Sequence, residues 1–128
     1  MVNLAPLDKL TALDAAAGDY FGYSVAIDGN TIVIGAYGAG AGGAVYVFRT
    51  TDGGATYDEI AKLTAADAAS GDYFGYSVAI SGGTIVVGAS NNGNTGTCWG
   101  CAGTGAVYVL HTSDGGATYA EVAKLTAA

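Results

Sequence analysis

A long internal repeat constrains this sequence more than any other feature. The segment from Leu10 to Ala36 returns at Leu63 to Ala89, offset by 53 positions and with five differences. The segment from Gly43 to Tyr57 returns at Gly105 to Tyr119, offset by 62 positions, so the second copy carries nine extra residues in between. Repeats of roughly 20 to 50 residues are typical of stacked units that bury their apolar surface against one another. The sequence therefore predicts two copies of one structural unit.

Each copy contains four segments that have the pattern of β-strands. The first, Tyr20 to Ile27, alternates large and small residues with the period of two that a strand requires. A short turn at residues 28–30 follows, of a type that Gly and Asn permit because they tolerate positive φ. The 22 glycines of the chain suit such turns. The predicted strands cover residues 20–27, 31–36, 44–49, 58–64, 73–80, 84–89, 106–111 and 120–126.

The strand at residues 31–36, TIVIGA, is apolar on both faces, so both sides of each sheet must be covered. No helical periodicity of useful length is present, and the sheets must therefore cover each other, as propeller blades do. We predict an all-β fold of β-propeller blades: two four-stranded antiparallel blades plus a partial N-terminal strand. Residues 1–11 would be an outer strand of a preceding blade, residues 12–64 the first blade, and residues 65–128 the second blade, with an inserted loop at 90–105.

Two pairs of dipeptides carry a resemblance to a known family. Phe21-Gly22 is followed by Gly35-Ala36, and Phe74-Gly75 by Gly88-Ala89. This pattern resembles the FG-GAP repeat of integrin α-subunit heads and of many microbial surface proteins. The resemblance covers nearly the whole chain and implies blades of a roughly seven-bladed propeller, used for adhesion and protein contacts. It also implies an extracellular or cell-surface location.

One departure from that family concerns metal binding. Calcium-binding members place an Asp-rich loop between the first two strands, where this chain has only Asp28-Gly29-Asn30 and Ser81-Gly82-Gly83. Calcium takes about six to eight oxygen ligands, and a three-residue turn does not supply them. We therefore predict no metal site and no cofactor.

The hairpins TTDGGATY and TSDGGATY, between the third and fourth strands, are similar to the Asp-box of sialidase and sortilin propellers. Asp52 and Asp114 are predicted to accept backbone N–H bonds within these turns. Asp19 and Asp72, just before the first strand of each copy, are predicted to cap turns as well. All four are therefore interpreted as structural residues. Sialidase activity would need an arginine cluster, and the chain has one arginine.

The inserted loop at residues 90–105 is the longest break in the repeat. Loops on a rigid scaffold commonly carry binding specificity. An exposed tryptophan there would pack on a sugar ring or on a partner protein. The alternative is a surface loop whose tryptophan folds back onto the blade. The candidate binding residues are Asn91, Asn92, Asn94 and Trp99.

The two cysteines, Cys98 and Cys101, belong to the same loop. A thioredoxin-type redox pair opens a helix, and none is predicted here. A zinc site needs four ligands, and two thiols fall short of that number. A structural disulfide is the preferred interpretation, and it would indicate an oxidising compartment.

Charge and residue types exclude several classes of function. Eleven Asp and Glu against four Lys and Arg give a net charge of −7, which argues against nucleic-acid partners. No apolar run of about 18 residues exists, so membrane insertion is not expected. The first ten residues lack the pattern of a signal peptide, so an export signal would lie upstream or have been removed. No arrangement of Ser, His and Asp or paired carboxylates indicates catalysis, and we predict a protein that is not an enzyme.

Two blades leave two outer faces bare. If each exposes about 400 to 500 Å² of apolar area, the lost stabilisation is on the order of 10 kcal/mol per face. The predicted partners are therefore copies of the chain itself or further blades, in a ring or an open stack. The predicted function is a structural, adhesive or protein-interaction module. The alternative is a carbohydrate-binding propeller that uses the loop at 90–105, and a protein or glycan ligand is compatible with either.

Overall fold

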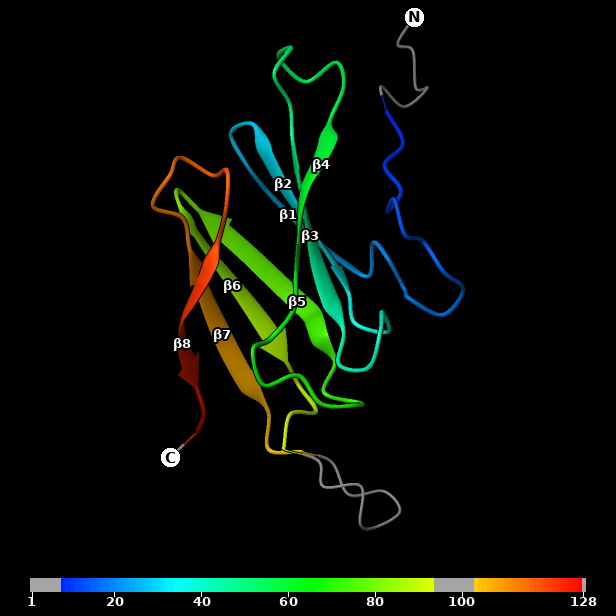
Figure 1. The fold of residues 1–128 in the computed structure, drawn as a ribbon, viewed down its shortest axis with the longest axis vertical. Coiled ribbons are helices and arrows are strands. Elements are labelled where there is room, and N and C mark those ends of the chain that lie inside the picture. Colours follow the sequence, from blue (N-terminus) through cyan, green and yellow to red (C-terminus); the bar gives the residue numbers. More distant parts are fainter. Residues whose placement is uncertain (1–7, 94–102, 128) are drawn as a thin grey trace, which may run out of the picture.

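The protein is built from two four-stranded antiparallel sheets, seen in a computed structural model that describes residues 8–93 and 103–127 (Figure 1). Within these residues all regular secondary structure is β-strand. The strand orders are β1-β2-β3-β4 and β5-β6-β7-β8, so each sheet is a simple meander. The strands are β1 Ser24–Asp28, β2 Thr31–Ala36, β3 Ala44–Arg49, β4 Asp58–Leu63, β5 Phe74–Ser81, β6 Thr84–Ala89, β7 Ala106–His111 and β8 Ala120–Leu125.

The predicted fold class is confirmed: both sheets are open, meandering and consistent with propeller blades. We call β1–β4 the first blade and β5–β8 the second blade. Strands β2, β3, β6 and β7 have the bounds that the repeat pattern predicts, because β-branched runs between glycine turns have sharp ends. Strands β4 and β8 each end one residue earlier than predicted.

The start of the first strand was predicted wrongly. Strand β1 begins at Ser24 rather than at Tyr20, because residues 20–23 form a turn in which the amide of Tyr23 donates to the carbonyl of Tyr20 at 3.0 Å. Tyr20 has a φ of 57° and Gly22 a φ of 90°, and neither value occurs in a strand. In the second blade the same turn interrupts β5 with a register shift between Phe74 and Ser77.

The main core lies between the two blades. Strand β2 alternates, so Val33 faces the second blade while Ile34 faces away from it. Val33, Val45 and Val47 of the first blade are fully buried. They share one apolar cluster with residues of the second blade, namely Phe74, Ile85, Val87, Tyr108 and Leu110. The two sheets therefore pack face to face, as the doubly apolar strand pattern requires.

The opposite face of the first blade has a smaller core. Ile34, Tyr46 and Phe48 are buried there, and Leu10 and Ala12 of the N-terminal segment pack in the same cluster. This segment runs along the side of the first blade that faces away from the second (Figure 1). Residues 8–11 are in no strand of the described structure, so the predicted outer strand at 1–11 stays a prediction.

Candidate interaction surface

The joint between the blades is formed by the dipeptide Phe74-Gly75. The amide of Phe74 donates to the carbonyl of Gly42 at 2.9 Å, next to a short parallel bridge between Gly43 and Phe74. The Oγ of Ser24 donates to the carbonyl oxygen of Gly75 at 2.8 Å. The Phe74 side chain is fully buried. The dipeptide at the start of β5 is therefore inserted into the first blade through main-chain hydrogen bonds.

Three glycines make this close approach of backbones possible. A Cβ atom at Gly35 would collide with the carbonyl oxygen of Gly75, and one at Gly43 would collide with the carbonyl oxygen of Phe74. A Cβ atom at Gly75 would meet the carbonyl oxygen of Ala44, and Gly75 has a φ of 95°. Each of these three positions therefore requires glycine, because a side chain would collide with a neighbouring backbone atom.

The second blade carries a hollow of about 450 Å³ at the place where the first blade holds Phe74-Gly75. We call this hollow the socket. It is lined by residues that include Ser77, Gly88, Gly105, Val107, Leu125 and Ala127. Their repeat equivalents in the first blade are Ser24, Gly35, Gly43, Val45, Leu63 and Ala65. The sequence of the binding place is thus present twice, and within residues 8–93 and 103–127 only the place on the first blade is occupied.

The face around the socket is exposed although its sequence equivalent is buried. Leu63 is 9% exposed and its equivalent Leu125 is 55% exposed. The valines at positions 33, 45 and 47 are fully buried. Their equivalents Val86, Val107 and Val109 are partly exposed. The difference arises from neighbours and not from residue type, because among the described residues another sheet covers this face of the first blade but not of the second.

On the first blade, residues are exposed whose equivalents in the second blade are packed at the joint. Val25 and Ile27 are 63% and 62% exposed, whereas their equivalents Val78 and Ile80 pack against the core between the blades. A Cβ atom at Gly22 would meet no atom within 4 Å, in contrast to the crowded position of Gly75. This surface of the first blade therefore matches the one that the second blade uses to contact the first.

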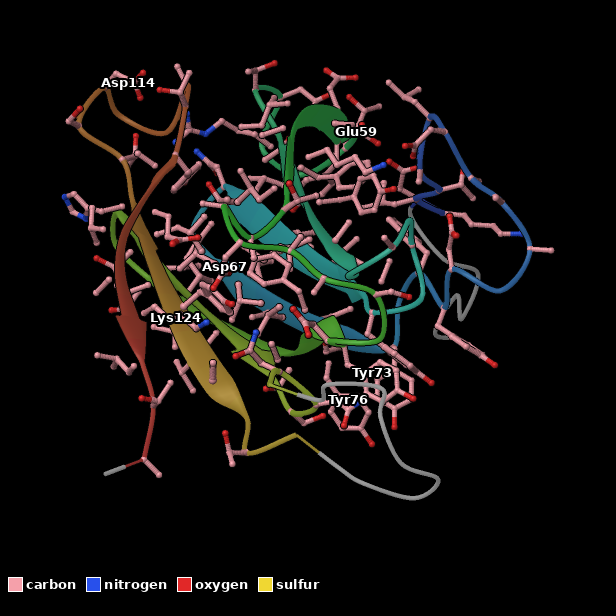
Figure 2. All side chains as sticks on the ribbon, turned by 60° about the horizontal axis from the view of Figure 1, so that its bottom comes forward. Glu59, Asp67, Tyr73, Tyr76, Asp114 and Lys124 are labelled. Atoms are coloured by element: carbon pink, nitrogen blue, oxygen red, sulfur yellow. The ribbon has the colours of Figure 1, made fainter. Side chains whose placement is uncertain are left out.

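Tyrosine side chains gather beside the joint, and sequence reasoning missed this cluster. The ring of Tyr37 lies 4.9 Å from Tyr20, 4.7 Å from Tyr23, 5.1 Å from Tyr73 and 5.2 Å from Tyr76, measured between ring centroids. Figure 2 shows Tyr73 and Tyr76 projecting at one end of the molecule. The sequence feature that points to this cluster is the motif DYFGY, which places a tyrosine on each side of both Phe-Gly dipeptides.

Each blade contains a buried tyrosine whose hydroxyl donates to an aspartate that also pairs with a lysine. The Tyr108 hydroxyl donates to Asp67 at 2.7 Å, and Asp67 also pairs with Lys124 (Figure 2). Burial, followed by the hydrogen bond to Asp67, raises the pKa of Tyr108 to about 12. The hydrogen bond from Lys124 holds the pKa of Asp67 below its ordinary value. The first blade repeats this arrangement with Tyr46, Asp14 and Lys62.

The two predicted Asp turns have the same internal hydrogen bonds. In the first, the amide and the hydroxyl of Thr56 donate to the Asp52 carboxylate at 2.9 and 2.6 Å, and the hydroxyl of Thr50 donates to it at 2.8 Å. These bonds lower the pKa of Asp52 well below its usual range, and the Thr118 hydroxyl and amide do the same for Asp114. Both carboxylates are thus occupied within their own turns.

Asp19 and Asp72 lie in turns that precede the first strands of the blades. Asp19 accepts the amide of Ala16 at 3.2 Å. Asp72 is buried, and it accepts the amide of Ala69 at 3.0 Å and the side-chain amide of Asn92 at 3.1 Å. Both therefore accept an amide three residues before them, the contact that a turn-capping role requires.

The loop at 90–105 is described only in part. The side-chain amide of Asn91 donates to the carbonyl of Gly71 at 2.7 Å, and that of Asn92 donates to the Tyr108 hydroxyl at 3.1 Å. Both asparagines thus make contacts within the second blade, and their predicted ligand role stays a prediction. The other predicted binding and disulfide residues lie outside the described residues: Asn94, Cys98, Trp99 and Cys101.

Within residues 8–93 and 103–127, no three His, Cys, Asp or Glu side chains come together as a group that would hold a metal ion. The same ranges contain no helix with the length and apolarity needed to cross a bilayer.

Two meandering four-stranded sheets, joined face to face through a Phe-Gly dipeptide, define a chain of β-propeller blades. The sequence model of the FG-GAP repeat matches residues 7–48 and 57–110. This chain belongs to the FG-GAP repeat family. No curated protein matches it.

Family membership supports a coarse statement of function. The FG-GAP repeat makes this chain a β-propeller-type module for protein interaction. Proteins built from the repeat are generally non-enzymatic and are typical of extracellular or surface locations. The geometry agrees with an interaction role in one respect: in the described residues the second blade presents a partly exposed apolar sheet face with a socket.

Proposed function

We propose that this chain is a non-catalytic structural or adhesive module, located outside the cell or at its surface, that associates with copies of itself. The proposal is carried by the exposed face of the second blade. Leu125 is 55% exposed there, whereas its equivalent in the first blade is buried against a neighbouring sheet. Exposed apolar patches of this kind are typical of interaction sites.

The face has the chemistry of a joint between blades. Val86, Val107, Val109 and Leu125 stand where the first blade has four buried residues. Burying an aliphatic side chain contributes about 1.5 to 3 kcal/mol relative to full exposure. Association costs an estimated 4 to 15 kcal/mol in lost freedom. The balance between these amounts predicts reversible association that depends on protein concentration.

A contact of this kind is heterologous, because the face of the second blade meets a different surface on the next copy. Heterologous contacts form closed rings when the rotation closes and open stacks when it does not. Three or four copies would give a ring of six or eight blades. The net charge of −7 favours solubility of such particles and disfavours nucleic-acid partners.

The test is the mass of the purified protein by light scattering and sedimentation velocity, from micromolar to millimolar concentration. We expect the mass to rise in steps of one chain. Val109→Asp places a charge in the exposed face and should reduce association. Val122→Asp is the matched control, because Val122 is 61% exposed on β8 and does not line the socket.

Two results would contradict the proposal. The first is a single chain at every concentration. The second is an equal loss of association in Val109→Asp and Val122→Asp, which would show that charge alone, and not the exposed face, controls the mass.

A further inference from the structure

We propose that the socket of the second blade is filled by the dipeptide Phe21-Gly22 of another copy, which makes the contact head to tail. This assignment rests on the self-association proposed above and identifies its partner segment. Phe21-Gly22 is the repeat equivalent of Phe74-Gly75, which fills the corresponding place on the first blade. We call Phe21-Gly22 the plug.

The plug already has the conformation of its equivalent. Gly22 has a φ of 90° and Gly75 a φ of 95°, and the preceding Tyr20 and Tyr73 have φ values of 57° and 65°. Positive φ is uncommon for tyrosine, so the turn is a specific structure rather than a loose loop. A segment that is already in its bound conformation loses little entropy when it binds.

The plug also holds its ring in the same place relative to its own blade. The ring of Phe21 lies 5.3 Å from Tyr46 with an interplanar angle of 70°. The ring of Phe74 lies 5.3 Å from Tyr108 with an interplanar angle of 73°. Phe74 is fully buried and Phe21 only partly so, because no sheet of the described residues covers Phe21 as the first blade covers Phe74.

The socket offers the polar and steric features that the plug requires. Ser77 is the equivalent of Ser24, whose Oγ donates to the carbonyl of Gly75, so Ser77 stands in place to donate to the carbonyl of Gly22. Gly88 stands where Gly35 admits the carbonyl of Gly75. A second copy would therefore find in Ser77 and Gly88 the equivalents of the contacts that Ser24 and Gly35 make within the chain.

One difference predicts that the contact between copies is weaker than the contact within the chain. The amide of Gly82 donates to the carboxylate of Asp28 at 2.5 Å across the joint between the blades. The equivalent of Asp28 in the second blade is Ser81, so the next copy loses a carboxylate partner at this position. Charge-assisted hydrogen bonds are stronger than neutral ones. The contact between copies should therefore be the weaker of the two, and it alone depends on protein concentration.

The plug is tested with Gly22→Ala. A Cβ atom at Gly22 meets nothing within 4 Å in the single chain, but its equivalent at Gly75 meets the carbonyl of Ala44. The substitution should abolish association while the chain stays folded. Gly53→Ala is the matched control: Gly53 has a φ of 77° and an equally open surrounding, so it bears the same backbone strain outside the contact.

The socket is tested with the double variant Ser77→Ala/Gly88→Ala. A Cβ atom at Gly88 would collide within the chain only with the Ser77 Oγ, which the first substitution removes. The Cβ would then fill the space of the Gly22 carbonyl oxygen. Ser77→Ala alone should weaken association only partly, because it removes one hydrogen bond and leaves the space open.

Mixing the two blocked proteins is the decisive experiment. Gly22→Ala keeps an intact socket, and Ser77→Ala/Gly88→Ala keeps an intact plug, so each alone should be a single chain. Together they should form a complex of two chains, and no larger particle. Sedimentation velocity measures this directly, and circular dichroism spectra and melting curves establish that each variant is folded.

The results distinguish a failure of the head-to-tail assignment from a failure of self-association as a whole. A wild-type protein that stays a single chain contradicts both. A wild-type protein that associates, with variants that associate equally well or a mixture that forms no pair, contradicts the head-to-tail assignment alone. In that case, the exposed face of the second blade would bind the same face of another copy, or a different partner.

Discussion

The hydroxyl groups of Tyr23 and Tyr76 lie 3.0 Å apart, although the two residues occupy the same position in successive repeats. Equivalent residues touch because β1 and β5, the first strands of the two blades, lie next to each other at the joint. The same step from one blade to the next would place Tyr76 beside Tyr23 of another copy. The tyrosine cluster thus extends with each added blade in a head-to-tail assembly.

Two equivalent glycines should respond differently to the same substitution. Gly35→Ala would place a Cβ against the carbonyl oxygen of Gly75, which is backbone and unable to move away. Gly88→Ala would meet only the side chain of Ser77. Overpacking of a tight site costs about 1 to 3 kcal/mol. We expect a large drop in melting temperature for Gly35→Ala and a small one for Gly88→Ala, measured by calorimetry at high dilution. Equal drops would contradict the packing at the joint.

Acid should destabilise the fold through the two Asp turns. The pKa of Asp52 and that of Asp114 are lowered from the ordinary value of 3.8 by hydrogen bonds to threonines. A lowered pKa in the folded state gives stability that is complete above the unfolded value and is lost progressively as pH falls from the unfolded value through the folded value. Asp52→Asn/Asp114→Asn should therefore lower the melting temperature at about pH 7, and the difference from the wild type should shrink steadily as pH falls below 3.8. A difference that is independent of pH would exclude this cause.

Alkaline titration should distinguish Tyr46 and Tyr108 from the other tyrosines by their higher pKa. The pKa of Tyr46 and that of Tyr108 are raised from 10.0 to about 12, mainly by burial. A raised pKa gives stability that is complete below about pH 10 and is lost as pH rises toward 12. Phenolate absorbance should show these two of the nine tyrosines ionising last. Asp67→Asn should lower the pKa of Tyr108 alone, and Tyr46 serves as the internal control.

Removal of residues 1–12 should strengthen self-association. Leu10 and Ala12 pack on the first blade, and by the repeat offset they correspond to Leu63 and Ala65, which are buried in the core between the blades. In a head-to-tail contact, Leu125 and Ala127 of the preceding copy are the equivalents that compete for this place. Sedimentation velocity of the shortened chain should show larger particles at a given concentration. Weaker association would mean instead that the N-terminal segment bridges neighbouring copies.

The strands and their order in each blade were predictable because the pattern that defines them is local. A run such as TIVIGA between glycine turns forms a strand in either copy, and β2 and β6 have the predicted bounds. The same holds for the Asp52 and Asp114 turns, whose hydrogen bonds join residues at most four positions apart. Because these hydrogen bonds join residues that are close in the sequence, the local residue pattern is sufficient to predict such turns.

The turn at residues 20–23 and the tyrosine cluster were not predictable in this way. The alternation of the DYFGY segment is that of a strand, but at the joint the register of β5 shifts between Phe74 and Ser77, and the dipeptide Phe74-Gly75 hydrogen-bonds to the neighbouring blade. Tyr37 has no tyrosine at the equivalent position in the second copy, where Ser90 stands. Its contacts with both DYFGY motifs arise only when the two blades pack.

The repeat, most strand bounds and the family of this protein could be read from the amino-acid sequence, because each depends on residues that are close together in the chain. Which of two equivalent sheet faces is buried became known from the packing of the two blades. Val47 and Val109 are equivalent residues in the strands AVYVFR and AVYVLH, yet the first is fully buried and the second partly exposed. Burial depends on what lies across the face, and among the described residues a neighbouring sheet covers that face of the first blade but not of the second.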